Sequence, residues 1–193
     1  MRSVEFLFDY ASPYSYLANE LLADRLPGVR ITYTPVYIRG FDMFSKGVPY
    51  SGPRLAYILK DLGRAAAEYN LPLRVPATFP VNGLYALRGA LAAKLAGMFD
   101  IYHRAMFRAV WAEGRETSNR DAVAQIMKTL GLGDLVPALD DSALKEELRT
   151  TTEAAARRGV FGVPTFFVEN EMFWGHDRMH QVARAALDHA VRS

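Results

Sequence analysis

The apolar pattern at the start of the chain predicts a short strand that runs directly into a helix. Val4-Glu5-Phe6-Leu7-Phe8 has the alternating aromatic and branched side chains that are typical of a buried strand. Pro13 suits the first position of a helix, and Ser12 suits the N-cap before it. The first N–H groups of this helix and the positive end of its dipole converge near the Ser12 hydroxyl. Such a place stabilises anions, a thiolate included. The alternative is that Ser12 only caps the helix.

The apolar pattern at the end of the chain predicts a hairpin followed by a helix. The stretches 162–168 and 171–175 have the composition of strands, and Glu169-Asn170 between them suits a tight two-residue turn. A strand-helix-strand unit at the start and a strand-strand-helix unit at the end is the order of the thioredoxin-like fold. The last helix begins near Arg178, because one of its faces is apolar at Met179, Val182, Ala183, Ala186, Leu187 and Ala190.

Helical periodicity fills the region between these two parts. Helices are predicted over about 53–70, 82–97, 99–113 and 141–158, and another is predicted from the capping box Ser118-Asn119-Arg120-Asp121 to Gly131. Neither outer part can complete a sheet without the other. The sequence therefore predicts an α/β protein with a thioredoxin-like domain formed by 1–41 and 156–193, and an inserted all-helical domain over 42–155.

The chain contains no cysteine, which restricts its chemistry. A thioredoxin-like protein without cysteine cannot exchange a disulfide through its own thiols. Thiolate zinc sites, iron–sulfur clusters and a cysteine nucleophile are excluded for the same reason. Any sulfur chemistry must therefore come from a bound thiol.

Charge and apolar content exclude two classes of partner. The net charge is +2, and the arginines are scattered through helical segments without forming a basic block, so nucleic-acid binding has no support. No apolar run approaches the roughly 18 residues of a membrane helix, and no signal peptide is visible. We expect a cytoplasmic protein without a membrane partner.

Motifs spread along the chain resemble those of one known family. They are SPYSYL at 12–17, FPVN at 79–82, GVFGVPT at 159–165 and FWGHDR at 173–178. In this order they resemble the 2-hydroxychromene-2-carboxylate isomerases and the related kappa-class glutathione transferases. The resemblance covers nearly the whole chain and implies the thioredoxin-like fold, with a cis peptide bond at Val163-Pro164.

The resemblance also implies glutathione as cofactor and assigns its contacts. The glutathione thiol has to be ionised near neutral pH, and Ser12, with Tyr14 beside it, would hold the thiolate. The main chain at Val163 and Pro164 would hold the tripeptide backbone as a strand edge does.

The segment Trp174-Gly175-His176-Asp177 would bind the γ-glutamyl end of glutathione. The first N–H groups of the last helix would face its carboxylate, and Asp177 would pair with its ammonium group. The alternative for Asp177 is a helix N-cap.

The loop from Phe44 to Arg54 departs from the family pattern. The family commonly carries a Gly-Asn pair and then a lysine there, whereas this loop has no asparagine and Arg54 stands where the lysine is expected. Arginine and lysine differ in hydrogen-bond geometry, so glutathione affinity or substrate choice is expected to change. We expect Arg54 and Asn82 to contact the carboxylate or hydroxyl of the substrate.

Two other patterns have less specific interpretations. His176 and His180 have i, i+4 spacing, but no third ligand is indicated, so no metal site is predicted. Aromatic side chains could line a substrate pocket or simply pack in the core. These are Tyr14, Tyr16, Tyr37, Phe44 and Trp174.

The resemblance therefore implies a glutathione-dependent isomerase of the 2-hydroxychromene-2-carboxylate type. Its substrate would be a small aromatic carboxylic acid, and its mechanism would be reversible addition of the glutathione thiolate. A transferase that keeps the conjugate and a non-catalytic thioredoxin-like binding module are the alternatives. Kappa-like relatives are usually homodimers, so a homodimer is expected.

Overall fold

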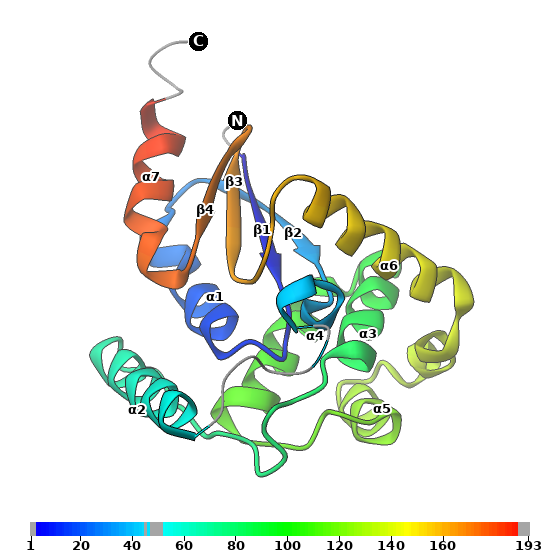
Figure 1. Cartoon of the computed structure of the whole chain (residues 1–193). Helices are drawn as coiled ribbons and strands as arrows, with labels where there is room; N and C mark the ends of the chain where they lie inside the picture. The colour runs from blue at the N-terminus through cyan, green and yellow to red at the C-terminus, as the bar shows by residue number, and fades with distance from the viewer. Residues whose placement is uncertain (1–2, 45, 47–51, 189–193) are drawn as a thin grey trace.

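The computed structural model describes residues 3–44, 46 and 52–188, and its centre is a four-stranded sheet (Figure 1). The strand order is β2-β1-β3-β4, with β1 parallel to β2 and antiparallel to β3, and β3 antiparallel to β4. The strands are β1 (Ser3–Phe8), β2 (Arg30–Pro35), β3 (Thr165–Val168) and β4 (Glu171–Trp174). The two ends of the chain thus form one sheet, as the sequence predicts.

Successive side chains of β1 point to opposite faces of the sheet, and both faces carry buried side chains. Val4, Phe6 and Phe8 belong to the main core, which also contains side chains of α1 (Pro13–Arg25) and α7 (Met179–Asp188). Leu7 belongs to a smaller core on the other face, together with Ala155 of α6 (Ser142–Arg157). Figure 1 shows α1 and α7 together on one side of the sheet and α6 on the other.

The remaining α-helices, and all but the last of the short helical turns, lie between β2 and β3 in the chain. The α-helices are α2 (Gly52–Glu68), α3 (Leu84–Leu95), α4 (Phe99–Phe107) and α5 (Arg120–Thr129). The shorter turns are η1 (Ile38–Gly40), η2 (Asp42–Phe44), the π-turn η3 (Arg108–Ala112), η4 (Gly133–Asp140) and η5 (His176–Arg178). The predicted helices are present, and the thioredoxin-like fold is confirmed. The division into 1–41 with 156–193 and 42–155 stays a prediction.

The capping box predicted at Ser118 is wrong in detail. The N-cap of α5 is Asn119, whose side chain accepts a hydrogen bond from Ala122 N at 2.9 Å. The Ser118 hydroxyl instead accepts from Asn82 N at 3.1 Å. A long-range partner thus outcompetes the local cap that the residue spacing suggested.

Helix length and apolarity do not suggest a membrane span. In the described part of the chain, no helix is both long and apolar enough to cross a bilayer.

Candidate active site

The turn between β1 and α1 buries the Ser12 hydroxyl. Ser12 has an extended backbone (φ −94°, ψ 114°) and caps α1, and its Oγ accepts a hydrogen bond from Ser15 N at 3.1 Å. The same hydroxyl donates to the carbonyl oxygen of Val163 at 3.2 Å. Ser12 therefore caps the helix, and its hydroxyl lies at the helix N-terminus. Its role towards a thiolate stays a prediction.

The bond from Ser12 ends on the segment that precedes β3. Val163-Pro164 is a cis peptide, which confirms the sequence expectation. The carbonyl oxygen of Pro164 accepts from Gly175 N at 3.0 Å, so this segment is held between the N-terminus of α1 and the end of β4. Phe79-Pro80 is also cis, which the sequence analysis did not predict.

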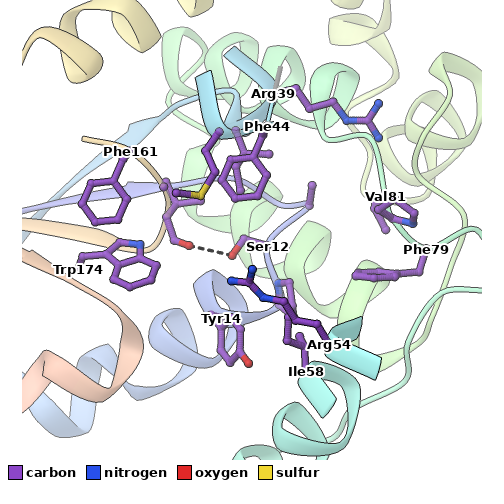
Figure 2. Close-up of a pocket in the computed structure, with 17 residues that line it drawn as sticks. Ser12, Tyr14, Arg39, Phe44, Arg54, Ile58, Phe79, Val81, Phe161 and Trp174 are labelled. Atoms are coloured by element: carbon purple, nitrogen blue, oxygen red, sulfur yellow. Dashed lines mark hydrogen bonds between the residues drawn. The ribbon is translucent and has the colours of Figure 1, made fainter. Parts of the chain in front are cut away.

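A cavity of about 280 Å³ lies over Ser12 (Figure 2). Its walls come from the β1–α1 turn, from η1 and η2, from α2, and from the segments around both cis prolines. Aromatic and aliphatic side chains dominate these walls, and the polar groups are few, as in small-molecule sites generally. The lining residues include Ser12, Tyr14, Ile38, Arg39, Met43, Phe44, Arg54, Ile58, Phe79, Val81, Phe161, Val163 and Trp174.

Two guanidinium groups line this cavity, those of Arg39 and Arg54. In Figure 2 Arg54 lies next to Tyr14, and Arg39 lies towards Val81. A guanidinium can bind a carboxylate through two parallel hydrogen bonds. The cavity therefore offers carboxylate-binding groups in addition to the helix N-terminus.

Asp9 forms hydrogen bonds to two segments that line the cavity. Its carboxylate is fully buried and accepts hydrogen bonds from Ala11 N and Ile38 N, each at 2.8 Å. Burial raises the pKa of Asp9 to about 6, against the lowering effects of these two bonds and of Arg39. The carboxylate thus joins the β1–α1 turn to η1. Sequence reasoning did not single out Asp9, because its long-range partner is visible only in the fold.

His176 and Asp177 line a smaller hollow beside the main cavity, of about 100 Å³. The His176 ring stacks on Tyr14 with centroids 5.1 Å apart, and burial lowers the pKa of His176. Asp177 is ion-paired with Arg178 at 2.8 Å. Tyr14 therefore stands between the hollow and the cavity over Ser12.

Asn82 is not among the residues that line the cavity. Its Oδ1 accepts from the Tyr37 hydroxyl at 3.1 Å and from Leu84 N at 3.2 Å. A ligand contact would therefore have to come from its Nδ2 group. The role of Asn82 in substrate binding stays a prediction.

The structure thus gathers most of the predicted site residues in one place. Those that line the cavity over Ser12, together with Ser12 itself, are Tyr14, Arg54, Val163 and Trp174. Pro164 and Gly175 support it through the bond between them. Sequence reasoning missed Ile58 and Phe161 as lining residues. Within the loop predicted to be divergent, positions 45 and 47–51 lie outside the described residues.

His176 lies in η5, and His180 lies in the first turn of α7. His180 Nδ1 lies 3.1 Å from the carbonyl oxygen of Asp177. Among residues 3–44, 46 and 52–188 there is no group of three or more His, Cys, Asp or Glu side chains that could hold a metal ion.

Fold and site together define a thioredoxin-like domain, and a family model described as "DSBA-like thioredoxin domain" matches residues 3–186. The chain is 30% identical to a 2-hydroxychromene-2-carboxylate isomerase of Sphingobium xenophagum, with 97% of this chain and 99% of that protein covered. A solved 2-hydroxychromene-2-carboxylate isomerase superposes with a TM-score of 0.82 at 32% identity, over 98% of this chain and 96% of that one.

Kappa-class transferases are more distant relatives. The rat protein "Glutathione S-transferase kappa 1" is 25% identical, over 94% of this chain and 89% of its own length. The chain therefore belongs to the 2-hydroxychromene-2-carboxylate isomerase family of DSBA-like thioredoxin domains, to which the kappa-class glutathione transferases are related. Relatives with these two activities support an enzyme.

Proposed function

We propose that this protein is a glutathione-dependent isomerase of the 2-hydroxychromene-2-carboxylate type that acts on a small aromatic carboxylic acid. The observation that carries the proposal is the Ser12 hydroxyl, buried at the N-terminus of α1 and at the floor of the 280 Å³ cavity. The named activities of the isomerase and transferase relatives support it.

The donor groups of this cavity fit a glutathione thiolate. Ser12 offers a hydroxyl hydrogen, and the helix N-terminus offers a positive field. Arg54 offers a cation for a carboxylate. Since the chain has no cysteine, the thiol must come with the ligand. The main chain around Val163 would hold the peptide backbone, and the hollow with His176 and Asp177 would take the γ-glutamyl end.

Bound glutathione would supply a thiolate that adds reversibly to an electrophilic carbon, so that a former double bond can rotate before elimination. The protein would stabilise the thiolate, orient the ligands and exclude water. The Ser12 hydroxyl, which donates to the Val163 carbonyl, would donate to the thiolate instead when glutathione is bound. The Arg39 and Arg54 guanidinium groups orient carboxylates of cofactor or substrate. The rings of Phe79, Phe161 and Trp174 exclude water from an aromatic body.

The isomerisation assay separates the enzyme from a binding module. We expect 2-hydroxychromene-2-carboxylate to interconvert with its ring-opened isomer, followed by absorbance, only when glutathione is added. S-Methylglutathione should bind and inhibit without supporting turnover, because its sulfur cannot form a thiolate. Turnover at an equal rate without any thiol would contradict the proposal.

The runner-up function is a transferase that keeps the conjugate, which the kappa-class relatives favour. Incubation with glutathione and 1-chloro-2,4-dinitrobenzene separates the two enzymes, because only a transferase accumulates the conjugate efficiently. A protein that neither converts these substrates nor is retained on immobilised glutathione would be the binding module. The homodimer stays a prediction, and sedimentation equilibrium measures it.

A further inference from the structure

A second cavity lies on the other side of η1 and has no part in the proposed reaction. Its volume is about 350 Å³, and its walls come from η1, α3 and α6. Tyr37 and Gly40 line this cavity, whereas Ile38 and Arg39 between them line the cavity over Ser12. One short turn therefore separates two cavities.

Arg88 of α3 is the residue of this second cavity that suggests a bound ligand. The side chain lines the cavity but is only 8% exposed. Its Nη1 donates to the carbonyl oxygen of Leu139 at 3.1 Å, whereas its buried Nε has no hydrogen-bond partner. In the described part of the chain no carboxylate forms an ion pair with Arg88. Its Cζ lies 5.4 Å from the centroid of the Tyr85 ring.

A buried guanidinium without a counter-ion is unfavourable, because the lost hydration is not replaced. An anion in the cavity would supply the missing counter-ion. A carboxylate can accept two parallel hydrogen bonds from the N–H groups of a guanidinium. The other buried polar groups of the cavity are already occupied: Thr152 Oγ1 accepts from Tyr37 N and donates to the carbonyl oxygen of Leu148.

The rim and walls restrict the kind of anion. Arg149 on the rim is shared by Glu146 and Glu153, and Lys145 adds one further cation. Together with Arg88, these groups leave a single positive charge, which suits a monoanion better than a phosphate dianion. Leu84 and Leu148 make the walls apolar. A cavity of about 150 Å³ already holds benzene, so this one has room for one or two rings.

We propose that the second cavity is a binding site for a small monocarboxylate with an apolar, ring-sized body, held by Arg88. The site does not need glutathione and does not depend on the proposed reaction. It is separate from the cavity over Ser12, in which Arg39 and Arg54 supply the cations.

Methyl-labelled NMR of the full chain, titrated with benzoate in the absence of glutathione, tests the site directly. We expect saturable shifts of the Leu84, Leu148 and Thr152 methyl groups that differ from any shifts of Ile38 and Ile58 in the other cavity. Benzamide has the shape of benzoate without its charge, so it should bind at least tenfold more weakly. Inorganic phosphate should cause no such shifts.

Substitution of Arg88 tests which group binds the carboxylate. Arg88→Leu should weaken benzoate binding roughly 10- to 100-fold, the range for a hydrogen bond to a charged group. Arg184→Leu removes an exposed arginine from α7 and is the charge-matched control, with no change expected. If Arg88→Leu does not fold, Leu84→Trp fills the cavity and should abolish the shifts.

Three results would overturn the proposal. They are benzoate shifts confined to Ile38 and Ile58, or none at all; equal affinity for benzoate and benzamide; and unchanged affinity in a folded Arg88→Leu or Leu84→Trp protein. None of them bears on the glutathione proposal, since that function is tested by turnover in the other cavity.

Discussion

Ser12→Ala removes two hydrogen bonds, although the sequence motif suggests only one. The hydroxyl accepts from Ser15 N as a helix cap and donates to the carbonyl oxygen of Val163. A lost N-cap costs about 1 kcal/mol, and a lost buried hydrogen bond costs about 1 kcal/mol more. The free energy of unfolding should therefore fall by about 2 kcal/mol. With a urea m-value of about 2 kcal/mol/M, the unfolding midpoint should fall by about 1 M.

Asn119→Ala is the matched control, because Asn119 is an exposed cap that accepts one bond, from Ala122 N. It should cost only about 1 kcal/mol. Urea titrations of both variants without glutathione give the comparison. Equal losses would mean that the bond to Val163 does not stabilise the fold, and the described link between α1 and the cis-proline segment would then be refuted. Ser12→Thr keeps a hydroxyl and should fall between wild type and Ser12→Ala.

Other substitutions test the walls of the site. Gly83→Ala should destabilise the fold by about 1–3 kcal/mol, because the new Cβ would lie 2.0 Å from the buried Oδ1 of Asp9. Gly63→Ala in α2 is the control and should not destabilise the fold, because there is open space around its Cβ. The raised pKa of Asp9 means that its carboxyl stabilises the fold less above about pH 6 than below about pH 4. When the pH is lowered from 7 to 4.5, the free energy of unfolding of the wild type should therefore rise by about 2 kcal/mol relative to that of Asp9→Asn, as measured by urea titrations. A difference between the two proteins that does not change with pH would contradict the raised pKa. Arg54→Ala should weaken the binding of a carboxylate ligand in the cavity by about 1.5–3 kcal/mol, measured by calorimetry, and Arg54→Lys should recover part of this loss. Equal affinities of the three proteins would show that Arg54 does not contact the ligand.

Local features of the site could be predicted because neighbouring residues determine them. The Ser12-Pro13 pair suits an N-cap and a first helical position whatever the rest of the chain does. The two-residue turn at Glu169-Asn170 could also be predicted, although the positive φ of 54° falls on Glu169 and not on Asn170, the residue type that adopts it more easily. The cis bond at Val163-Pro164 depended on the family resemblance, since most X-Pro bonds are trans.

Long-range partners could not be predicted in the same way. Ser118 and Asn119 are both good caps by composition, and the choice between them depends on Asn82, which lies 36 positions away from Ser118 and occupies its hydroxyl. The Oδ1 of Asn82 is itself occupied by the hydroxyl of Tyr37. Such choices follow from packing between distant segments, which periodicity does not report.

The hydrogen bonds of Ser12 also limit how much it can lower the pKa of a thiol in the proposed site. The hydroxyl already makes a neutral hydrogen bond to Val163, so only the difference between that bond and a charge-assisted bond to a thiolate lowers the thiol pKa. This difference is about 1 kcal/mol. The field at the N-terminus of α1 adds about 1 kcal/mol for a partly buried anion. Together they lower a thiol pKa of about 8.5 by about 1.5 units, to about 7. The two effects are thus sufficient for a thiolate near neutral pH.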